Sequence, residues 1–259
     1  MLILSLFSGI DLLGQGFREQ GFCVVSAGDL ILGQDIRNFQ GIAGKFEGII
    51  GGSPCQDFSL ARRTPPTGYG REMLTEFARI VLQCEPNWFL HENVPGVPQF
   101  GITGYTMQRF FLNARECGST QNRNRYFQFG SKLGFVLDIK RQPKAKQAQP
   151  CAMATEGTKQ TRRTWAQFCE LQGIAQPFDL PELTKAAAYK VVGNAVSLHV
   201  SRTVAAAIND AHDSPVFWHQ VKTCECGCGR IVSKNRKTAN DACRKRLNVN
   251  RRQATSAAA

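Results

Sequence analysis

Residues 2–17 read LILSLFSGIDLLGQGF: an apolar run, a turn that contains Gly9, and the beginning of a helical pattern. Three further apolar runs end where a loop begins, namely FCVVSA (22–27), GIIGG (48–52) and NWFLHE (87–92). Short runs of this kind predict buried strands. Because helical sequence separates them, the pattern favours an α/β fold with a doubly wound, mostly parallel sheet.

The sequence between and after these strands shows helical periodicity. In REMLTEFARIVLQC (71–84), the side chains of Leu74, Phe77, Ala78 and Val81 fall on one face of a helix. We expect a helix over FFLNARECG (110–118) before a strand at RYFQFG (125–130). Residues 131–161 lose the periodicity and predict a loop. Two more helices are expected at TWAQFCELQ (164–172) and SLHVSRTVAAAI (197–208).

The composition, 42% hydrophobic and 20% charged, is typical of a globular protein. The apolar N-terminus has no basic region and no small-residue cleavage site, and Asp11 interrupts it, so we expect no targeting peptide. We also expect no membrane span. Six of the ten cysteines are scattered singly and four cluster near the C-terminus, which fits a reducing compartment.

The net charge of +12 is concentrated in two stretches. Residues 222–252 contain ten Lys or Arg and only two acids, and residues 140–163 contain seven Lys or Arg and one acid. Such clustering is typical of a surface that binds a polyanion. The alternative is a solvated basic tail with no dedicated partner.

The residues that follow the strands are candidates for a site, because doubly wound sheets bind ligands beyond the carboxyl ends of their strands. The turn at Gly9 lets the backbone approach a nucleotide-like ligand. Asp29 follows the strand at 22–27, where a carboxylate can accept hydrogen bonds from ribose hydroxyls. Asp35 could accept one from an adenine amino group while Ile36 packs on the ring. Each acid, taken singly, is more often a turn or cap residue.

Three later motifs carry reactive side chains. In GGSPCQDFS, Cys55 is flanked by proline and polar residues in a loop, a better setting for a thiolate nucleophile than for an inert thiol. In HENVPG, Glu92 ends a buried strand, where an unpaired carboxylate is costly. In QNRNRYF, Arg123 and Arg125 alternate along a strand, which aims both guanidinium groups the same way.

The order of these motifs resembles that of the bacterial and phage cytosine-C5 DNA methyltransferases. FSGI is similar to the family's first cofactor motif, GGSPCQ to its proline–cysteine loop, ENV to its glutamate motif and QNRNR to its paired arginines. RRTWAQFCELQG and VVGNAVSLHVSRTVAAAI are similar to the last two motifs. The resemblance covers Met1 to about Asp210 and implies the Rossmann-like fold of the S-adenosylmethionine methyltransferases.

The resemblance also implies a mechanism. Cys55 would attack C6 of a cytosine flipped out of duplex DNA, and Glu92 would hold or protonate N3. Arg123 and Arg125 would bind the base carbonyl oxygen and a neighbouring phosphate, and could help keep Cys55 ionised. C5 would then take the methyl group of S-adenosylmethionine, and elimination would free the enzyme. The residues implied to contact the cofactor are Phe7, Gly9, Ile10, Asp29, Asp35, Ile36, Gly52, Pro54, Asn194, Ala195 and Val196.

The chain departs from the family pattern at several points. Asp11 stands where glycine is usual, Ser197 stands where proline usually follows GNAV, and the interval from Asp29 to Asp35 is short, as if a helix were missing. The variable recognition domain is reduced to about 30 residues. We expect a catalytic core, a reduced target-recognition segment, a return to the core and a basic tail, at residues 1–130, 131–161, 162–213 and 214–259.

The basic tail contains Cys224, Cys226, Cys228 and Cys243. Four thiolates around zinc would form a closed structural site. Because the first three cysteines are closely spaced, Cys224 or Cys226 alone could join the other two ligands, with His219 as a spare. The alternative is a disordered basic tail with free thiols.

We therefore expect a monomeric DNA (cytosine-5-)-methyltransferase that acts on double-stranded DNA, with no membrane association and no obligate protein partner. Its expected role is phage or prophage DNA modification that protects against restriction. One alternative is an RNA cytosine-C5 methyltransferase, since a relative of the family methylates transfer RNA. Another is a catalytically impaired DNA-binding relative, which Asp11 and Ser197 favour and the intact Cys55, Glu92 and Arg123 oppose.

Overall fold

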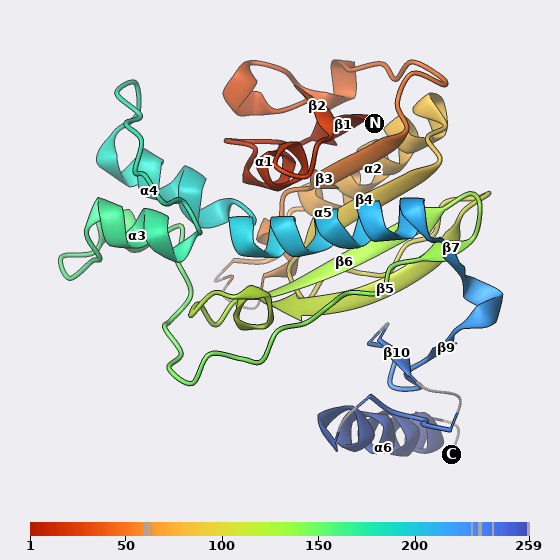
Figure 1. Ribbon diagram of the computed structural model, residues 1–259. Coiled ribbons are helices and arrows are strands. Elements are labelled where there is room, and N and C mark those ends of the chain that lie inside the picture. Colours follow the sequence, from red (N-terminus) through yellow and green to blue (C-terminus); the bar gives the residue numbers. More distant parts are fainter. Residues whose placement is uncertain (60–61, 63, 229, 233–234, 240, 258–259) are drawn as a thin grey trace.

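A six-stranded sheet forms the centre of the molecule in the computed structural model (Figure 1). The structure describes residues 1–59, 62, 64–228, 230–232, 235–239 and 241–257. The strand order is β2-β1-β3-β4-β6-β5. Only β6 runs against its neighbours, so the expected doubly wound, mostly parallel sheet is confirmed. The strands are β1 (Leu2–Leu6), β2 (Cys23–Ala27), β3 (Gly48–Gly52), β4 (Trp88–Asn93), β5 (Thr106–Asn113) and β6 (Asn124–Ser131).

Helices cover both faces of this sheet (Figure 1). Strand side chains alternate between the two faces, so in β1 Ile3 packs toward α1 and α5, while Leu4 packs toward α2. Both faces are therefore apolar, which is why the strands are near-continuous apolar runs in the sequence. The helices are α1 (Leu12–Arg18), α2 (Tyr69–Cys84), α3 (Trp165–Leu171), α4 (Lys185–Asn194), α5 (Leu198–Asp213) and α6 (Asp241–Ala257).

The prediction of a helix over residues 110–118 is wrong. Residues 110–113 end β5, and residues 114–117 form a single 3-10 turn with an Asn113–Glu116 capping box. Phe110 and Leu112 pack into the core below α5, whereas Phe111 between them points away from it. This alternation has the period of a strand rather than of a helix. The end of β5 thus takes the place of the expected helix, and β6, at the position of the expected strand, runs antiparallel to β5.

The short interval from Asp29 to Asp35 is accommodated by two 3-10 turns, Leu30–Leu32 and Ile36–Asn38, between β2 and β3. The helices α3 and α4 form a lobe beside the sheet around Phe168, Tyr189 and Val192 (Figure 1). By length and composition the segment Lys185–Asp213 could cross a membrane. It is divided into α4 and α5. In its most apolar stretch of 18 residues, 61% is buried inside the fold, as in a core helix.

Residues 137–152 run as an extended strap along the outer side of β5 and the turn that follows it. The strap is tied to the core at several points, for example by Gln142 N–H, which donates to the Glu116 carbonyl at 2.8 Å, and by Gln149, which bridges to Gln121. A separate recognition domain is not seen among these residues. Assignment of residues 131–161 to target recognition stays a prediction.

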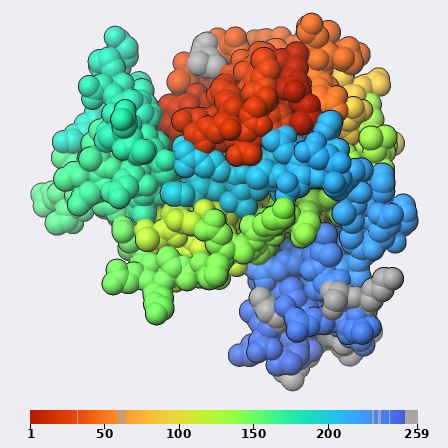
Figure 2. Space-filling model, viewed as in Figure 1, coloured from red at the N-terminus to blue at the C-terminus, as the bar shows by residue number. Residues whose placement is uncertain are grey.

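The chain after α5 forms a small module below the sheet, seen as a dark blue bulge in Figure 2. Strand β8 (Val216–Phe217) pairs with β7 (Phe135–Val136), and β9 (Lys222–Thr223) pairs with β10 (Ile231–Val232). The module ends in α6, which lies below β5 in Figure 1. Over the residues described, the tail thus contains β8, β9, β10 and α6.

The carboxylate of Asp11 connects β1, β2 and α1. It accepts hydrogen bonds from Ser5 Oγ at 2.7 Å, Ser26 Oγ at 2.8 Å and Gly14 N–H at 3.1 Å, and pairs with Arg18 at 2.6 Å. Asp11 also has a left-handed backbone, φ 55°, which aspartate tolerates better than alanine does. The residue that departs from the family pattern is therefore a helix cap.

We predict that Asp11→Ala lowers the free energy of unfolding by about 1–3 kcal/mol, because a helix cap is removed and the hydroxyls of the buried Ser5 and the partly buried Ser26 lose this acceptor. Asp11→Asn, which keeps a cap but not the ion pair, should be less destabilised. Urea titration followed by circular dichroism measures both. Asp213→Ala, at an exposed carboxylate, is the matched control. Equal unfolding midpoints for Asp11→Ala and the control would contradict this role.

Candidate active site

A cavity of about 460 Å³ opens at the carboxyl ends of β1, β3 and β4. Its position follows from the strand order: the chain leaves β1 for β2 on one side and returns to β3 on the other, and loops at such a switch point diverge to leave a crevice. The volume suits a small-molecule ligand. Motifs far apart in the sequence meet there, including the loops after β1 and β3, the end of β4, Arg125 of β6 and the end of α4.

Cys55 lies on the wall of this cavity in the loop after β3, half-buried. A hydrogen-bond network beneath the loop fixes its start: Ser53 Oγ and His91 Nε2 are 2.9 Å apart, and Asn93 Nδ2 donates to the Ser53 carbonyl at 3.0 Å. Burial lowers the pKa of His91 to about 3, so this imidazole is neutral. The network connects the Cys55 loop rigidly to β4.

Glu92 lies opposite this loop, at the end of β4, with only 7% of its surface exposed. Space for the carboxylate depends on Gly52, because a Cβ atom there would lie 2.8 Å from Glu92 Oε2. Arg125 Nε is 2.8 Å from Glu92 Oε1 and forms an ion pair with it. Oε1 is buried against this guanidinium.

The electrostatics of Cys55 and Glu92 are coupled. Burial raises the pKa of the Glu92 carboxyl, against the lowering effect of Arg125 and Arg123. Burial also raises the pKa of the Cys55 thiol, as does the charge of Glu92, and the two arginines oppose this without outweighing it. At neutral pH Cys55 is therefore mainly a thiol. That the arginines help to keep it ionised stays a prediction: both lower the pKa of the thiol, but less than burial and Glu92 raise it.

Arg123 and Arg125 do not play equivalent parts. Arg125 reaches the cavity, whereas Arg123, 3% exposed, points into the protein. Its guanidinium donates to the carbonyls of Ala152 at 3.0 Å, Gly193 at 2.9 Å and Ala195 at 3.0 Å. Arg123 is not among the residues that line the cavity, so it is placed to position the site rather than to contact a base directly.

The other half of the cavity is formed by the predicted cofactor residues. Phe7, Gly9 and Ile10 follow β1, and Gly9 N–H donates to Asp29 Oδ2 at 2.8 Å. Gly9 has φ 56°, a conformation that favours glycine. Asp29 Oδ1 accepts from Ile31 N–H, so each oxygen retains a lone pair that faces the cavity loops.

Asp35 and Ile36 close the far end of this half. Asp35 forms an ion pair with Arg37. Hydrogen bonds from Arg37 lower the pKa of the Asp35 carboxyl to about 2, so Asp35 is charged at neutral pH. Ile36 is buried beside it. Gly52 and Pro54 line the wall between this half and Cys55.

The chain returns to the same cavity at the end of α4. Asn194 ends α4, Ala195 caps it, and both line the cavity. Val196, also predicted to contact the cofactor, packs in the core below α5 and lines a small second cavity together with Phe7, Gly52 and Asn194. Lys190 and Val191 line the cavity and were missed, although they lie one helical turn before Asn194.

Neither Asp11 nor Ser197 lines the cavity. Ser197 is buried at the N-terminus of α5, with 1% of its surface exposed. These departures from the family pattern therefore alter the packing around the cavity rather than its wall. They give no support to the impaired-relative alternative.

The four clustered cysteines lie outside this cavity, in the C-terminal module. Their Sγ atoms all lie within 4.8 Å of one another. His219 is not part of the group and stacks on Phe217 instead, with ring centroids 5.9 Å apart. The suggestion of His219 as a spare ligand is wrong, since the short turn at Trp218–Gln220 holds it beside β8.

The motifs and the geometry can be compared with known proteins. The model of the C-5 cytosine-specific DNA methylase family matches residues 31–166, more than half of the chain. Type II methyltransferase M.HgiDI of Herpetosiphon aurantiacus is 32% identical over 170 residues, which cover 54% of this chain and 55% of that protein. Type II methyltransferase M.HindV of Haemophilus influenzae is 32% identical over 161 residues, covering 50% and 53%. The chain thus spans about half the length of the curated relatives it matches.

Solved structures resemble the chain over a larger part of its length. A protein described as a DNA modification methyltransferase, encoded within a prophage of E. coli, superposes with a TM-score of 0.58 at 17% identity, covering 83% of this chain and 100% of that one. At this identity the likeness concerns the fold, and it confirms the expected Rossmann-like methyltransferase fold. Since the family model includes Cys55, Glu92 and both arginines within its matched residues, the chain belongs to the C-5 cytosine-specific DNA methylase family.

Proposed function

We propose that the chain is a DNA (cytosine-5-)-methyltransferase that transfers a methyl group from S-adenosylmethionine to C5 of a cytosine flipped out of duplex DNA. The observation that carries the proposal is one cavity whose wall combines Cys55, Glu92 and Arg125 with the residues of the cofactor motifs. A nucleophile, a buried carboxyl and a cation around one reacting ring are what addition to a pyrimidine requires.

The shape and chemistry of the cavity fit S-adenosylmethionine. Each Asp29 oxygen accepts one hydrogen bond and retains acceptor capacity for a ribose hydroxyl, and the buried Ile36 offers an apolar wall for the adenine ring. Asp35 lines the same part of the cavity, and both of its oxygens already accept hydrogen bonds from Arg37. When bound, S-adenosylmethionine supplies an electrophilic methyl group on a sulfonium. Pro54 and Gly52 separate this half of the cavity from Cys55, which would place cofactor and base side by side.

The residues around Cys55 would act in sequence on the base. The Cys55 sulfur, once it has lost its proton, adds to C6, and the electron pair of the C5–C6 bond moves to C5. The Glu92 carboxyl, which lines the cavity, would hold a proton at N3 as charge develops in the ring. C5 would then take the methyl group, leaving the cofactor as a neutral thioether. Loss of the C5 proton to solvent would let the C6–sulfur bond break and return the Cys55 thiolate. Because burial and the charge of Glu92 raise the pKa of the Cys55 thiol, we expect loss of its proton to solvent to accompany the attack.

Duplex DNA is the substrate that the family description favours over RNA. The basic residues of the strap and of the C-terminal module would supply phosphate contacts, and residues 131–161 would supply the few contacts to bases. We therefore propose a short or degenerate recognition sequence. A monomer in a bacterial or phage-infected cytoplasm, modifying phage or prophage DNA against restriction, is consistent with the prophage-encoded structural neighbour.

The first test concerns the nucleophile. Cys55→Ser should bind duplex DNA and S-adenosylmethionine normally but should lose turnover, because a neutral hydroxyl adds poorly to C6. With duplexes that contain 5-fluorocytosine, the unaltered protein should form a covalent adduct visible by denaturing electrophoresis. Cys23→Ser, at an exposed cysteine on β2, is the matched control and should form the adduct. An adduct formed by Cys55→Ser would overturn the assignment.

The second test separates the two effects of Glu92. In Glu92→Gln, turnover should fall by on the order of a hundredfold or more, because general acid assistance at N3 is lost. Removing the negative charge should at the same time lower the pKa of Cys55, so that iodoacetamide alkylates Cys55 faster at pH 8 and the alkylation profile moves to lower pH. A variant with normal turnover, or with slower alkylation of Cys55, contradicts the role given to Glu92.

The third test concerns the basic module. Lys245→Gln, on the exposed side of α6, combined with Arg236→Gln, should weaken binding to duplexes of every sequence alike. The logarithm of the binding constant falls as the logarithm of the salt concentration rises. This slope should become less steep by about one for each phosphate that the variant no longer neutralises. The methylated sequence should not change. Lys45→Gln, at the amino ends of the strands and away from the cavity, is the control. A changed recognition sequence would show that the module reads bases.

A further inference from the structure

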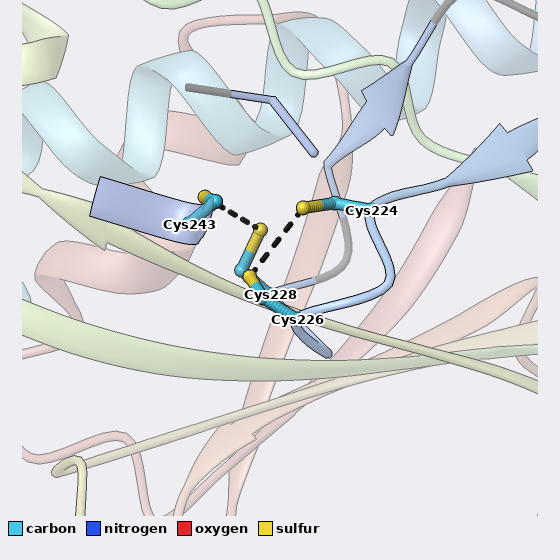
Figure 3. Close-up of side chains that lie close together, drawn as sticks. All are labelled: Cys224, Cys226, Cys228 and Cys243. Carbon is cyan, nitrogen blue, oxygen red and sulfur yellow. Dashed lines mark hydrogen bonds between the residues drawn. The ribbon is translucent and has the colours of Figure 1, made fainter. Parts of the chain in front are cut away.

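The four cysteines of the C-terminal module converge on one point. Figure 3 shows three of them in a single turn, Cys224, Cys226 and Cys228, and Cys243 in the first turn of α6, with all four sulfur atoms turned inward. All four side chains are buried. Cys243 follows Cys228 by 15 residues, so the fold rather than the sequence spacing brings Cys243 to the others.

The distances between sulfur atoms fit metal ligands and not disulfides. The Sγ atoms of Cys224 and Cys226 are 3.4 Å apart, and those of Cys228 and Cys243 are 3.7 Å apart. A disulfide needs about 2 Å. Four sulfur atoms at about 2.3 Å from a tetrahedral zinc ion lie about 3.8 Å from one another.

The surroundings of the cluster suit a centre that carries net negative charge. The backbone N–H of Ala239 donates to Cys224 Sγ at 3.3 Å, and Arg230 Nη1 lies 3.8 Å from Cys243 Sγ. Donors of this kind orient thiolate ligands and stabilise their charge. Apart from the cysteines, Val232 is the buried apolar residue of this cluster, with Ala239 and Leu247 partly buried. So small a core cannot offset the entropy of ordering the module without a further constraint.

We propose that Cys224, Cys226, Cys228 and Cys243 bind one zinc ion, and that the metal holds the basic helix α6 against the edge strand β5. Four sulfur ligands select zinc or iron among the common metals. A closed tetrahedral set leaves no position for a substrate, so the site is structural. The proposal does not rest on methyl transfer.

The module docks on β5 through Phe111, which packs against the cysteine cluster. The guanidinium carbons of Arg230 and Arg246 each lie 5.2 Å from the centre of the Phe111 ring, and Arg230 pairs with the buried Glu116 at 3.3 Å. In the sheet, Phe111 stands opposite Tyr126, the residue after Arg125. The metal thus fixes a basic helix close to the strand that supplies the arginine of the active site.

The experiment is elemental analysis of the full chain, purified under reducing conditions and dialysed against a metal-free buffer. We expect about one zinc per chain, with iron at background. Cys228→Ser combined with Cys243→Ser should lose the zinc, while Cys23→Ser should retain it. Cobalt substituted for zinc should give the absorption bands of a tetrahedral thiolate site. Zinc far below one per chain with the four thiols reduced, iron in its place, or zinc retained by the double variant would overturn the proposal.

The second half of the proposal is tested by Phe111→Ala. This variant should keep its zinc, because no ligand is altered, but trypsin should cleave faster after Arg244 and Lys245 once α6 is no longer held against β5. Phe217→Ala, at the β8 end of the module, is the matched control. The same digestion applied to the double cysteine variant should give still faster cleavage. Cleavage of both cysteine and Phe111 variants at the rate of the unaltered chain would show that the metal does not order the helix.

Discussion

The buried carboxylate at the end of β4 is the constraint around which the active site is organised. Glu92 is 7% exposed, and a charge in that position is tolerated only with a compensating cation nearby. The cation comes from Arg125 of β6, and the space comes from the missing side chain of Gly52 on β3. Three adjacent strands therefore each contribute one feature to the same carboxyl group. A shift of one residue in the register of β4 and β6 would turn Arg125 to the other face of the sheet.

The paired arginines have different roles because Arg125 lies within β6 and Arg123 lies before it. Arg125 faces the cavity, while Arg123, just before the strand, binds three backbone carbonyls on segments that the chain reaches only later. A planar guanidinium with five donors suits this role, which a lysine could not fill. In this way the wall contributed by Asn194 and Ala195 is tied to the strand that carries the site cation. One motif thus contributes both to the chemistry and to the closure of the cavity.

Much of this arrangement was predictable from the sequence, and the failures have physical causes. Strand–loop boundaries placed Gly9, Asp29, Cys55 and Glu92 at one sheet edge, because polar residues that directly follow buried apolar runs have few other locations. The expected helix at 110–118 failed because two adjacent phenylalanines fit either period, and only the partner strand β6 decides between them. The position of Val196 and the inward turn of Arg123 depend on contacts with distant segments. No local pattern encodes those contacts.

Strand β5 forms one edge of the sheet, and its free side would otherwise present unpaired backbone groups. Two contacts cover that side in this chain. Arg141 Nη2 donates to the Phe111 carbonyl at 2.8 Å, and the cysteine module packs over the Phe111 ring. The module therefore protects the sheet from edge-to-edge association with other chains. Loss of the cysteine cluster would dismantle the module and uncover this edge, while the catalytic residues would stay in place. Solubility, rather than chemistry, would then be the first property of this protein to depend on the integrity of that cluster.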